Sequence, residues 1–292
     1  MKTTDAENID SQKSQTWSLE IKPSRGVLDI PFREIWEYRD LLFLLVRRDF
    51  VAMYKQTILG PLWFVIQPVL TTLVFTVIFG NIAKISTDGL PHVLFYLAGI
   101  TCWSYFSDSL TKTSETFSQN AKIFGKVYFP RIIVPLSIVV SNLFKLGIQF
   151  VIFLIFLMYY WISGDLVHPN VLALIFPFLI ILMGGIGLSM GMIISSLTTK
   201  YRDLRFLLAF AVQLLMYATP VIYPVSALPE KYATIILVNP IAPIIETFRL
   251  GFLGQGNFDI SSLLYSFSFM IVSLIVAIII FNKVEKNFMD TV

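Results

Sequence analysis

The sequence predicts an all-α integral membrane protein with six transmembrane helices, an N-terminal amphipathic interface helix and a re-entrant helical hairpin between spans five and six. Two observations lead to this prediction. The 292 residues are 56% hydrophobic and only 14% charged, whereas soluble domains contain about 25% charged residues. The charges are also gathered between long apolar runs, and a helix needs roughly 20 mostly apolar residues to cross a bilayer.

The first 30 residues are polar and lack the apolar core of a signal peptide. We therefore expect residues 1–30 to form an uncleaved cytosolic tail. Residues 31–58 predict an amphipathic interface helix, because apolar side chains recur at three- and four-residue steps from Ile35 to Met53. Its basic residues have two interpretations. They either anchor the helix to anionic headgroups alone, or Arg47, Arg48 and Lys55 also meet a phosphate-bearing substrate.

Residues 59–282 are expected to form a single transmembrane domain. Gly60-Pro61 is the corner where the surface helix turns into the first span, since proline fits the first turn of a helix. Lys145 is the one charge deep within a predicted span. It either faces a polar interior, as a charge of the channel, or reaches back to the cytosolic surface. The six predicted spans cover about residues 60–83, 90–112, 132–162, 170–197, 206–224 and 260–282.

Small residues lie on one face of the fourth predicted span. Gly187 and Gly191 are four positions apart, a spacing that lets two helix backbones approach closely. Packing within one subunit is one interpretation of this face, and a seam between two subunits is the other. The face comprises Gly184, Gly187, Gly191 and Ser195.

The segment of about residues 226–252 is apolar, but it is too short and too interrupted to be a simple span. Its charge-free core, Tyr232–Ile245, has only 14 residues, and its prolines would break a continuous helix. Two half-helices that meet near Asn239-Pro240 therefore predict a re-entrant hairpin. An ordinary extracellular loop is the alternative.

The basic residues predict the orientation. Of the 22 Lys and Arg residues, 18 fall on one side of the predicted spans, three fall on the other side, and Lys145 lies within a span. Cytosolic loops carry the excess of Lys and Arg. Both termini, including a tail over residues 283–292, are therefore expected in the cytosol.

The loop after the second span contains a segment, Ser118–Tyr128, that is expected to form a short helix ended by Pro130. It combines basic residues with Phe124, Tyr128 and Phe129, which we expect to be exposed. Aromatic residues beside charges suit docking to a protein partner. A solvated connecting loop is the alternative.

Several kinds of chemistry are missing from the sequence. It has no Gly-x-x-x-x-Gly-Lys-Ser/Thr loop, so the chain is not expected to bind ATP itself. His92 and His168 lie far apart in the sequence, and Cys102 is the one cysteine. This argues against a metal site and excludes an intrachain disulfide. No acidic relay threads the spans and no Ser/His/Asp set appears. The chain is therefore not expected to be an enzyme, and any energy source is another polypeptide.

Five blocks in order resemble the membrane subunit of polysaccharide-export ABC transporters, a family that exports O-antigens, capsule-like polymers and teichoic acids. The resemblance covers about residues 30–290, and the first 30 residues carry no such signal. The blocks are RRDFVAMYKQTILGPLWFVIQPVLTTLVFTVIFG (47–80), NAKIFGKVYFPRIIVPL (120–136), TTKYRDLRFLL (198–208), ATPVIYPVSALP (218–229) and NPIAPIIETFRLGFLG (239–254).

The resemblance implies a homodimer of six-span subunits in a bacterial inner membrane, with separate ATPase subunits that bind ATP and Mg. The implied substrate is an undecaprenyl-diphosphate-linked glycan, O-antigen-like or teichoic-acid-like, that leaves through a channel at the dimer interface. Membrane lipid is a further partner, and nucleic acid is not. An ABC exporter of a drug or small lipid and an ATP-independent channel or scramblase are the alternative functions. An enzyme acting on lipid-linked sugars is disfavoured, because paired catalytic acids are missing.

The resemblance also implies roles for particular segments. Residues 31–58 are the interface helix, with the lipid diphosphate entering at Arg47, Arg48 and Lys55. Residues 118–130 are the coupling or gate helix that the ATPase moves, and residues 224–256 close the exit. No role is implied for Lys145. The coupling-helix residues are Asn120, Lys122, Phe124, Lys126, Tyr128 and Arg131, and the extracytoplasmic gate residues are Pro220, Pro224, Pro229, Asn239, Pro240, Glu246 and Arg249.

Overall fold

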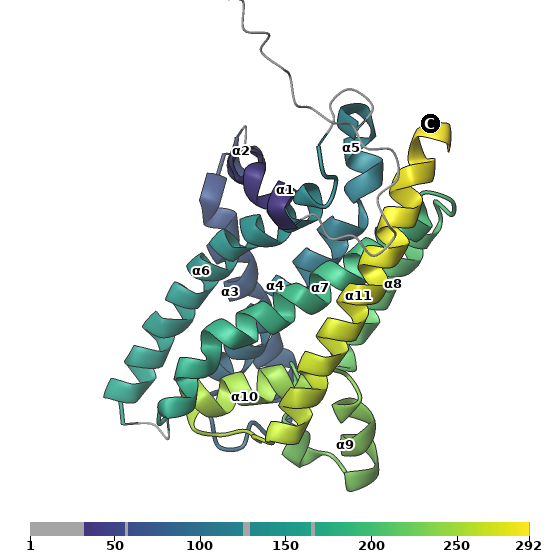
Figure 1. Ribbon diagram of the computed structural model, residues 1–292. Helices are drawn as coiled ribbons and strands as arrows, with labels where there is room; N and C mark the ends of the chain where they lie inside the picture. The colour runs from purple at the N-terminus through teal and green to yellow at the C-terminus, as the bar shows by residue number, and fades with distance from the viewer. Residues whose placement is uncertain (1–31, 56–57, 125–128, 165–166, 292) are drawn as a thin grey trace, which may run out of the picture.

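The computed structural model describes residues 32–55, 58–124, 129–164 and 167–291, and every regular element in these ranges is a helix (Figure 1). The predicted all-α fold class is thus confirmed. The predicted tail over residues 1–30 lies outside the described residues. In chain order the helices are α1 (Phe32–Glu37), α2 (Arg39–Tyr54), η1 (Gly60–Leu62), α3 (Trp63–Phe75), η2 (Thr76–Ile82), α4 (His92–Ser114), α5 (Thr116–Phe124), α6 (Ile133–Ile162), η3 (Val171–Ile175), α7 (Phe176–Thr198), α8 (Leu204–Tyr217), η4 (Val225–Ala227), α9 (Glu230–Leu237), α10 (Ala242–Leu253) and α11 (Ile260–Thr291).

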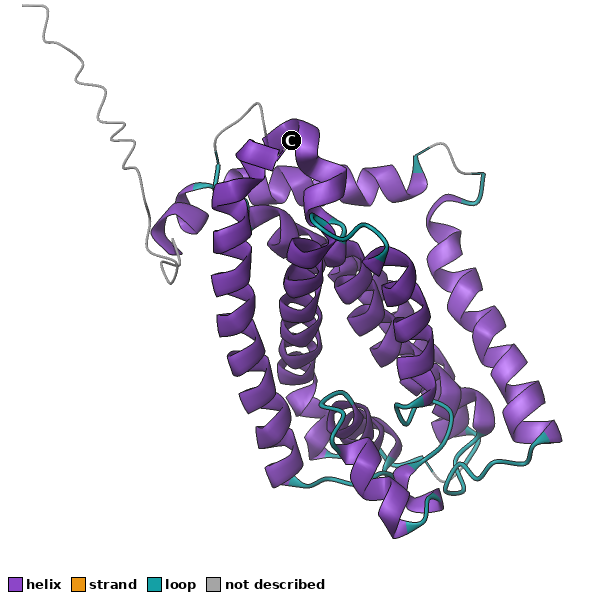
Figure 2. Ribbon diagram, turned by 90° about the vertical axis from the view of Figure 1, so that its right-hand side faces the viewer, coloured by secondary structure: helices purple, strands orange, loops and turns teal. Residues whose placement is uncertain are grey.

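The long helices run side by side between two distinct ends of a bundle (Figures 1 and 2). One end carries α1, α2, α5 and the C-terminal part of α11, and we call it the basic end. The other end carries α9 and α10, and we call it the hairpin end. The first and last described helices therefore lie at the same end, as an even number of crossings requires.

Four helical stretches of the described chain are long and apolar enough to cross a membrane. They correspond to the predicted spans one, three, four and six. The predicted second and fifth spans correspond to α4 and α8, which do not meet the same test, so the count of six stays a prediction. The four stretches are Gly60–Ile82, Ile133–Ile162, Val171–Thr198 and Ile260–Glu285.

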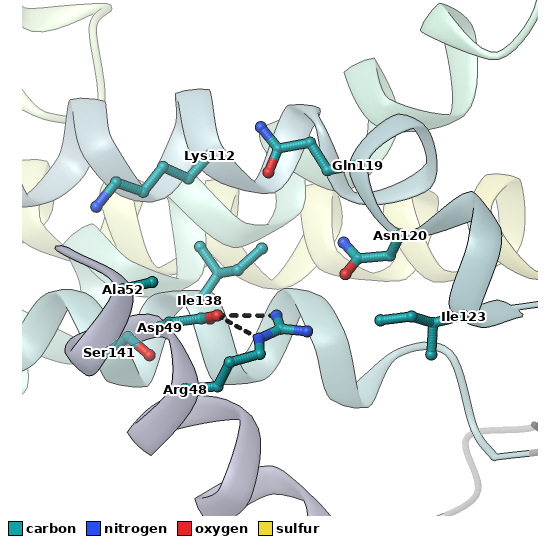
Figure 3. A pocket seen from close by; sticks show the side chains of 9 residues that line it. All are labelled: Arg48, Asp49, Ala52, Lys112, Gln119, Asn120, Ile123, Ile138 and Ser141. Atoms are coloured by element: carbon teal, nitrogen blue, oxygen red, sulfur yellow. Dashed lines mark hydrogen bonds and ion pairs between the residues drawn. The ribbon is translucent and has the colours of Figure 1, made fainter. Parts of the chain in front are cut away.

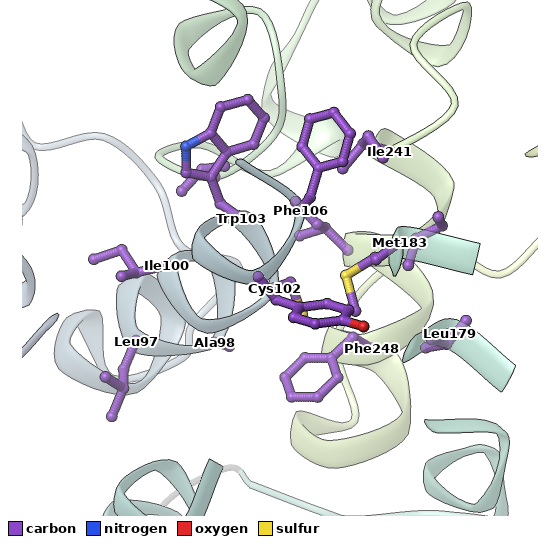
Figure 4. Close-up of a cluster of buried hydrophobic side chains, with 14 of the residues drawn as sticks. Leu97, Ala98, Ile100, Cys102, Trp103, Phe106, Leu179, Met183, Ile241 and Phe248 are labelled. Atoms are coloured by element: carbon purple, nitrogen blue, oxygen red, sulfur yellow. The ribbon is translucent and has the colours of Figure 1, made fainter. Parts of the chain in front are cut away.

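Helix α4 lies in the middle of the bundle. It packs against α3, α6, α7, α8 and α10, and every residue from Leu94 to Trp103 is buried. Figure 4 shows Cys102 and Phe106 of this helix within a cluster of apolar side chains that Met183 and Phe248 complete. Because neighbouring helices shield α4 from lipid, it can carry polar residues that lipid contact would penalise. Hydropathy alone therefore identifies α4 poorly.

Gly184, Gly187 and Gly191 of α7 face α4. A Cβ atom added at Gly187 would lie 2.9 Å from Cβ of Ser109, and one added at Gly191 would lie 2.5 Å from Cβ of Thr113. Such short contacts require glycine at both positions. The small-residue face of the fourth span thus packs inside the subunit, which is the first of its two interpretations.

The interface helix is split. It was predicted as one helix over residues 31–58, but α1 and α2 are separated at Tyr38, whose φ and ψ are −91° and 18°. Helix α2 packs along α6 and buries Leu45. The predicted corner is present, because Gly60 has a φ of 49° and Pro61 lies in the first turn of η1.

Two predicted helix ends differ from the structure. Helix α8 ends at Tyr217 rather than near residue 224, because Pro220 cannot continue the helix and restricts the residue before it. Helix α11 continues to Thr291, past the predicted end of the last span at residue 282. The predicted tail over residues 283–292 is therefore largely helical.

The hairpin breaks where the sequence predicts. The helical parts Lys231–Leu237 and Ala242–Leu253 are bent by 98°, and Asn239-Pro240 lies between them. The Asn239 side-chain oxygen accepts a hydrogen bond from the Ile241 backbone nitrogen at 3.0 Å, which stabilises the turn. Whether this pair of helices dips into the membrane stays a prediction.

Candidate functional site

A pocket of about 380 Å³ opens at the basic end, among α2, α4, α5 and α6 (Figure 3). We call it the basic-end pocket. It joins the predicted interface helix to the predicted coupling helix, two segments that are far apart in the sequence. Its lining residues are Arg48, Asp49, Ala52, Lys112, Gln119, Asn120, Ile123, Ile138 and Ser141.

One wall of the pocket carries an ion pair within α2. Nη2 of Arg48 lies 2.8 Å from Oδ1 of Asp49, and Nε of Arg48 donates to the same oxygen at 2.9 Å. The Arg48 side chain is 40% exposed, and a pair this open to solvent contributes only about 0–1 kcal/mol. Arg47 and Lys55 are exposed on the same segment but do not line the pocket. Of the three predicted phosphate contacts, the structure brings only Arg48 into it.

Lys112 supplies a second cation that the sequence analysis did not single out. Its Nζ donates to Oδ1 of Asn142 at 2.8 Å, and it makes no ion pair with another described residue. Figure 3 shows its side chain across the pocket from the Arg48–Asp49 pair. No local signal in the sequence identifies it as a pocket residue, because its spacing of one helical turn from Asp108 predicts an ion pair within α4, whereas Asp108 pairs with Lys145.

Lys145 is neutralised by an aspartate of the neighbouring helix. Its Nζ lies 2.6 Å from Oδ2 of Asp108, and the two side chains are 13% and 25% exposed. The side chain thus faces α4 rather than the end of the bundle, which favours the polar-interior interpretation over the surface one. This pair belongs to a row of polar contacts between α4 and α6, which we call the polar row: Ser104–Gln149 at 3.1 Å, Asp108–Lys145 and Lys112–Asn142.

The coupling helix is oriented differently from the prediction. Phe124 and Phe129 were expected to be exposed, but they are only 4% and 6% exposed, because both pack into an aromatic core with Phe117 and Phe281. Asn120 is 7% exposed and donates to the Thr116 carbonyl at 3.0 Å. The outward positions of α5 are Ser118, Gln119 and Ile123. The side chain of Lys122 and all of Lys126 and Tyr128 lie outside the part that the structure describes.

Arg131 fastens the start of α6 to the end of α11. It donates to the Glu285 carbonyl at 2.8 Å, pairs with the Glu285 carboxylate at 3.7 Å and lies 5.4 Å from the centre of the Phe124 ring. Burial lowers the pKa of Arg131, and Glu285 offsets part of this effect. Arg131 therefore stabilises the packing around α5 in this conformation.

A buried ion pair lies at the hairpin end. Arg249 of α10 is 1% exposed and donates to the carbonyls of Pro220 and Val221 at 2.6 and 2.7 Å. Its guanidinium lies 3.7 Å from the centre of the Phe95 ring and 3.4 Å from Oε1 of Glu246. Arg249 thus holds the turn after α8 against α10 and α4. The structure brings three predicted gate residues together here: Pro220, Glu246 and Arg249.

The other predicted gate residues lie at the ends of the hairpin helices. Asn239 donates to Oγ1 of Thr219 at 2.8 Å, and the Pro240 carbonyl accepts from Ser266 of α11 at 2.7 Å. Pro224 and Pro229 precede η4 and α9. These contacts fix the hairpin to the turn after α8 and to α11.

The fold is that of a multi-pass helical membrane protein, with a basic pocket at one end of the bundle and a broken helix pair at the other. The model of the ABC-2 type transporter family matches residues 40–253. The chain belongs to this family of transporter membrane proteins.

Three relatives show how the similarity is distributed. The O-antigen export system permease protein RfbA of Klebsiella pneumoniae is 30% identical over 255 residues, covering 86% of this chain and 94% of the relative. RfbA of Myxococcus xanthus is 26% identical and covers 89% of this chain and 98% of the relative. The polysialic acid transport protein KpsM of Escherichia coli is 23% identical, and the match covers 85% of this chain and 93% of the relative.

Proposed function

We propose that the chain is the permease subunit of an ATP-driven exporter. It moves an undecaprenyl-diphosphate-linked polysaccharide, O-antigen-like or teichoic-acid-like, from the cytosol across the bacterial inner membrane. The observation that carries this proposal is the 30% identity to an O-antigen export permease over 86% of this chain. The relative named for polysialic acid transport widens the class of polymer but keeps it a polysaccharide.

The proposed assembly is a homodimer with a channel at the subunit interface. Each subunit crosses the membrane six times, with α4 and α8 as the second and fifth crossings and both termini in the cytosol. The gathering of α1, α2 and the end of α11 at one end supports this topology (Figure 1). Helices α9 and α10 form the re-entrant hairpin at the exit.

ATP and Mg are bound by a separate ATPase subunit in this proposal. Helix α5 is the element that the ATPase moves, and its place at the basic end of the bundle, beside the basic-end pocket, supports that role (Figure 1). Arg47, Arg48 and Lys55 guide the lipid diphosphate toward the bundle from the surface helix.

Deletion of the chain tests the proposal directly. We expect surface polysaccharide to disappear, lipid-linked polymer to accumulate inside the cell, and an ATPase to co-purify with the tagged chain. Re-expression of the chain should restore the surface polymer. Intact surface polysaccharide in the deletion strain, together with no co-purified ATPase, would reject the proposal.

A further inference from the structure

The basic-end pocket has the chemistry of an anion site. Two of its lining residues are cations, Arg48 and Lys112, and they come from two different helices. Gln119 and Asn120 add amide groups and Ser141 adds a hydroxyl. Cations together with neutral donors are what a phosphate oxygen recognises. Its volume of about 380 Å³ is within the range of small-ligand pockets, about 300–1,000 Å³.

The two cations are held in different ways. Lys112 donates to the neutral Asn142 amide at 2.8 Å, so its charge is not cancelled by that contact. Arg48 is paired with Asp49 at 2.8 Å, so its charge is offset while that contact lasts. In the described structure, Lys112 is therefore the lining cation whose charge is available to pair with an anion. Arg48 becomes available only when its ion pair with Asp49 breaks.

The charges around Lys112 favour this assignment. The nearest ion pair on the same helix face is Asp108–Lys145, whose 2.6 Å contact leaves Asp108 already neutralised. Among the described residues that line the pocket, Asp49 is the one acidic residue, and it pairs with Arg48. A dianionic group in the pocket would pair with Lys112 and would compete with Asp49 for Arg48.

We propose that the basic-end pocket is a phosphate-binding site in which Lys112 is the anchoring cation and Asp49 is a latch that releases Arg48 to the bound anion. The inference rests on the proposed function for the identity of the natural ligand, a lipid-linked diphosphate. It differs from the sequence prediction because it gives the central role to Lys112 of α4, while Arg47 and Lys55 lie outside the pocket and take no part in binding there.

Pyrophosphate binding to the purified full-length chain tests the site without lipid or sugar. The chain is placed in nanodiscs of zwitterionic lipid, and its thermal midpoint is followed as pyrophosphate is added, with chloride at matched ionic strength as the reference. A ligand that binds the folded state raises the midpoint. We expect Lys112→Gln to weaken pyrophosphate binding about tenfold, as the loss of one charge-assisted contact implies, and Lys112→Arg to retain it.

Two further variants distinguish pyrophosphate binding in the pocket from non-specific attraction of pyrophosphate to the basic surface. Asp49→Asn frees Arg48 and should tighten pyrophosphate binding several-fold. Arg39→Gln removes an exposed charge from the same surface helix, away from the pocket lining, and should change nothing. Equal binding by the wild type, Lys112→Gln and Arg39→Gln, or weaker binding by Asp49→Asn, would overturn the proposal.

Nanodiscs of anionic phosphatidylglycerol distinguish the source of the phosphate. If they abolish the Lys112-dependent shift, a membrane phospholipid headgroup occupies the site. If the shift persists, the site selects a diphosphate over the surrounding lipid. Surface polysaccharide in the deletion strain is measured separately, so failure of pyrophosphate binding and failure of the export proposal are distinct results.

Discussion

Arg249 shows how one buried charge can hold a turn. Its guanidinium donates to two backbone carbonyls, pairs with Glu246 and lies over the Phe95 ring. Its Nε has no hydrogen-bond partner in the part of the chain that the structure describes. Gly99 leaves the room it needs, because a Cβ atom there would lie 2.8 Å from Nη2 of Arg249. The Arg249 side chain is thus enclosed by α4, α10 and the turn after α8.

Replacing Arg249 with Met should destabilise the folded chain by about 3–5 kcal/mol, because it leaves Glu246 as a buried unpaired charge. The midpoint of thermal unfolding in detergent measures the loss. The double variant Arg249→Met with Glu246→Gln should recover part of it. If the double variant is no more stable than the single one, the pair does not account for the loss.

Asp259 stabilises the beginning of α11. Its carboxylate accepts from the backbone nitrogens of Ser261 and Ser262 at 3.2 and 3.0 Å and from both hydroxyls. These hydrogen bonds lower the pKa of Asp259 to about 2, against about 3.9 in an unfolded chain. A lowered pKa means that the contribution of Asp259 is complete above about pH 4 and is lost as the pH falls toward 2.

Asp259→Ala should therefore lower the thermal midpoint at pH 7, and the difference from the wild type should shrink between about pH 4 and pH 2. Unfolding monitored at several pH values gives the comparison. Asp259→Asn keeps an acceptor without the charge, so its thermal midpoint at pH 7 should lie between those of the wild type and Asp259→Ala. A difference that is constant across this pH range would contradict the assignment.

At the level of the helices, the contact between α4 and α7 depends on glycine. Gly191→Val places side-chain atoms where Thr113 already lies, and overpacking of this kind costs about 1–3 kcal/mol. Gly147→Ala of α6 is the matched control, because a Cβ atom there meets nothing within 4 Å. We expect a lower thermal midpoint for the first variant and an unchanged or higher one for the second. Equal midpoints would show that the contact is loose.

Helix α5 has an exposed face and a buried face, and variants on the two faces should have different effects. Ile123 is 39% exposed, whereas Phe124 is 4% exposed. Ile123→Asp should leave the fold intact and weaken stimulation of the partner ATPase, because it places a charge on the outward face. Ile123 also lines the basic-end pocket, so pyrophosphate binding by this variant is measured in parallel. Phe124→Ala should instead lower the thermal midpoint, since large-to-small changes in a core cost about 3–5 kcal/mol. ATPase rates and unfolding curves of the reconstituted complex distinguish them, and an unchanged ATPase rate for Ile123→Asp would exclude this face from docking.

Charge-free runs in the sequence locate most of the long helices, including the buried α4, which lies at the predicted position of the second span. Long apolar runs identify Ile133–Ile162 and Ile260–Glu285 because lipid contact demands such runs. The end of α8 at Tyr217 was missed because the apolar pattern continues past it, while tertiary contacts to Arg249 fix the following turn. The inward direction of Phe124 was missed because basic residues neighbour it in the sequence, and only its packing with Phe117, Phe129 and Phe281 buries it.

The basic-end pocket was predicted only in part for a similar reason. Arg48 stands out in a charged cluster near the membrane surface, which is a local feature of the sequence. Lys112 comes from a helix 64 positions further on, and only the packing of α2, α4 and α6 brings the two together. A pocket residue contributed by a distant helix cannot be predicted from the sequence until the packing of the helices is known.

For the whole molecule, the alternating path of the helices predicts a topology that can be measured. Green fluorescent protein fused after Val292 should fluoresce, because it folds in the cytosol. Alkaline phosphatase inserted after Gln255, in the loop at the hairpin end, should be active, because it needs the extracytoplasmic side. The reciprocal fusions are the controls. A fluorescent protein that works at both positions would rule out the proposed topology.

The Asp108–Lys145 pair also determines how the molecule responds to voltage. One elementary charge that moves across a membrane potential of 100 mV exchanges about 2.3 kcal/mol with the field. A lone lysine at the depth of Lys145 would make any helix movement sensitive to that potential. The aspartate 2.6 Å away cancels this charge, and two opposite charges that move together exchange almost no energy with the field. The Asp108–Lys145 pair therefore adds almost no voltage sensitivity to a movement of α4 and α6 as a unit.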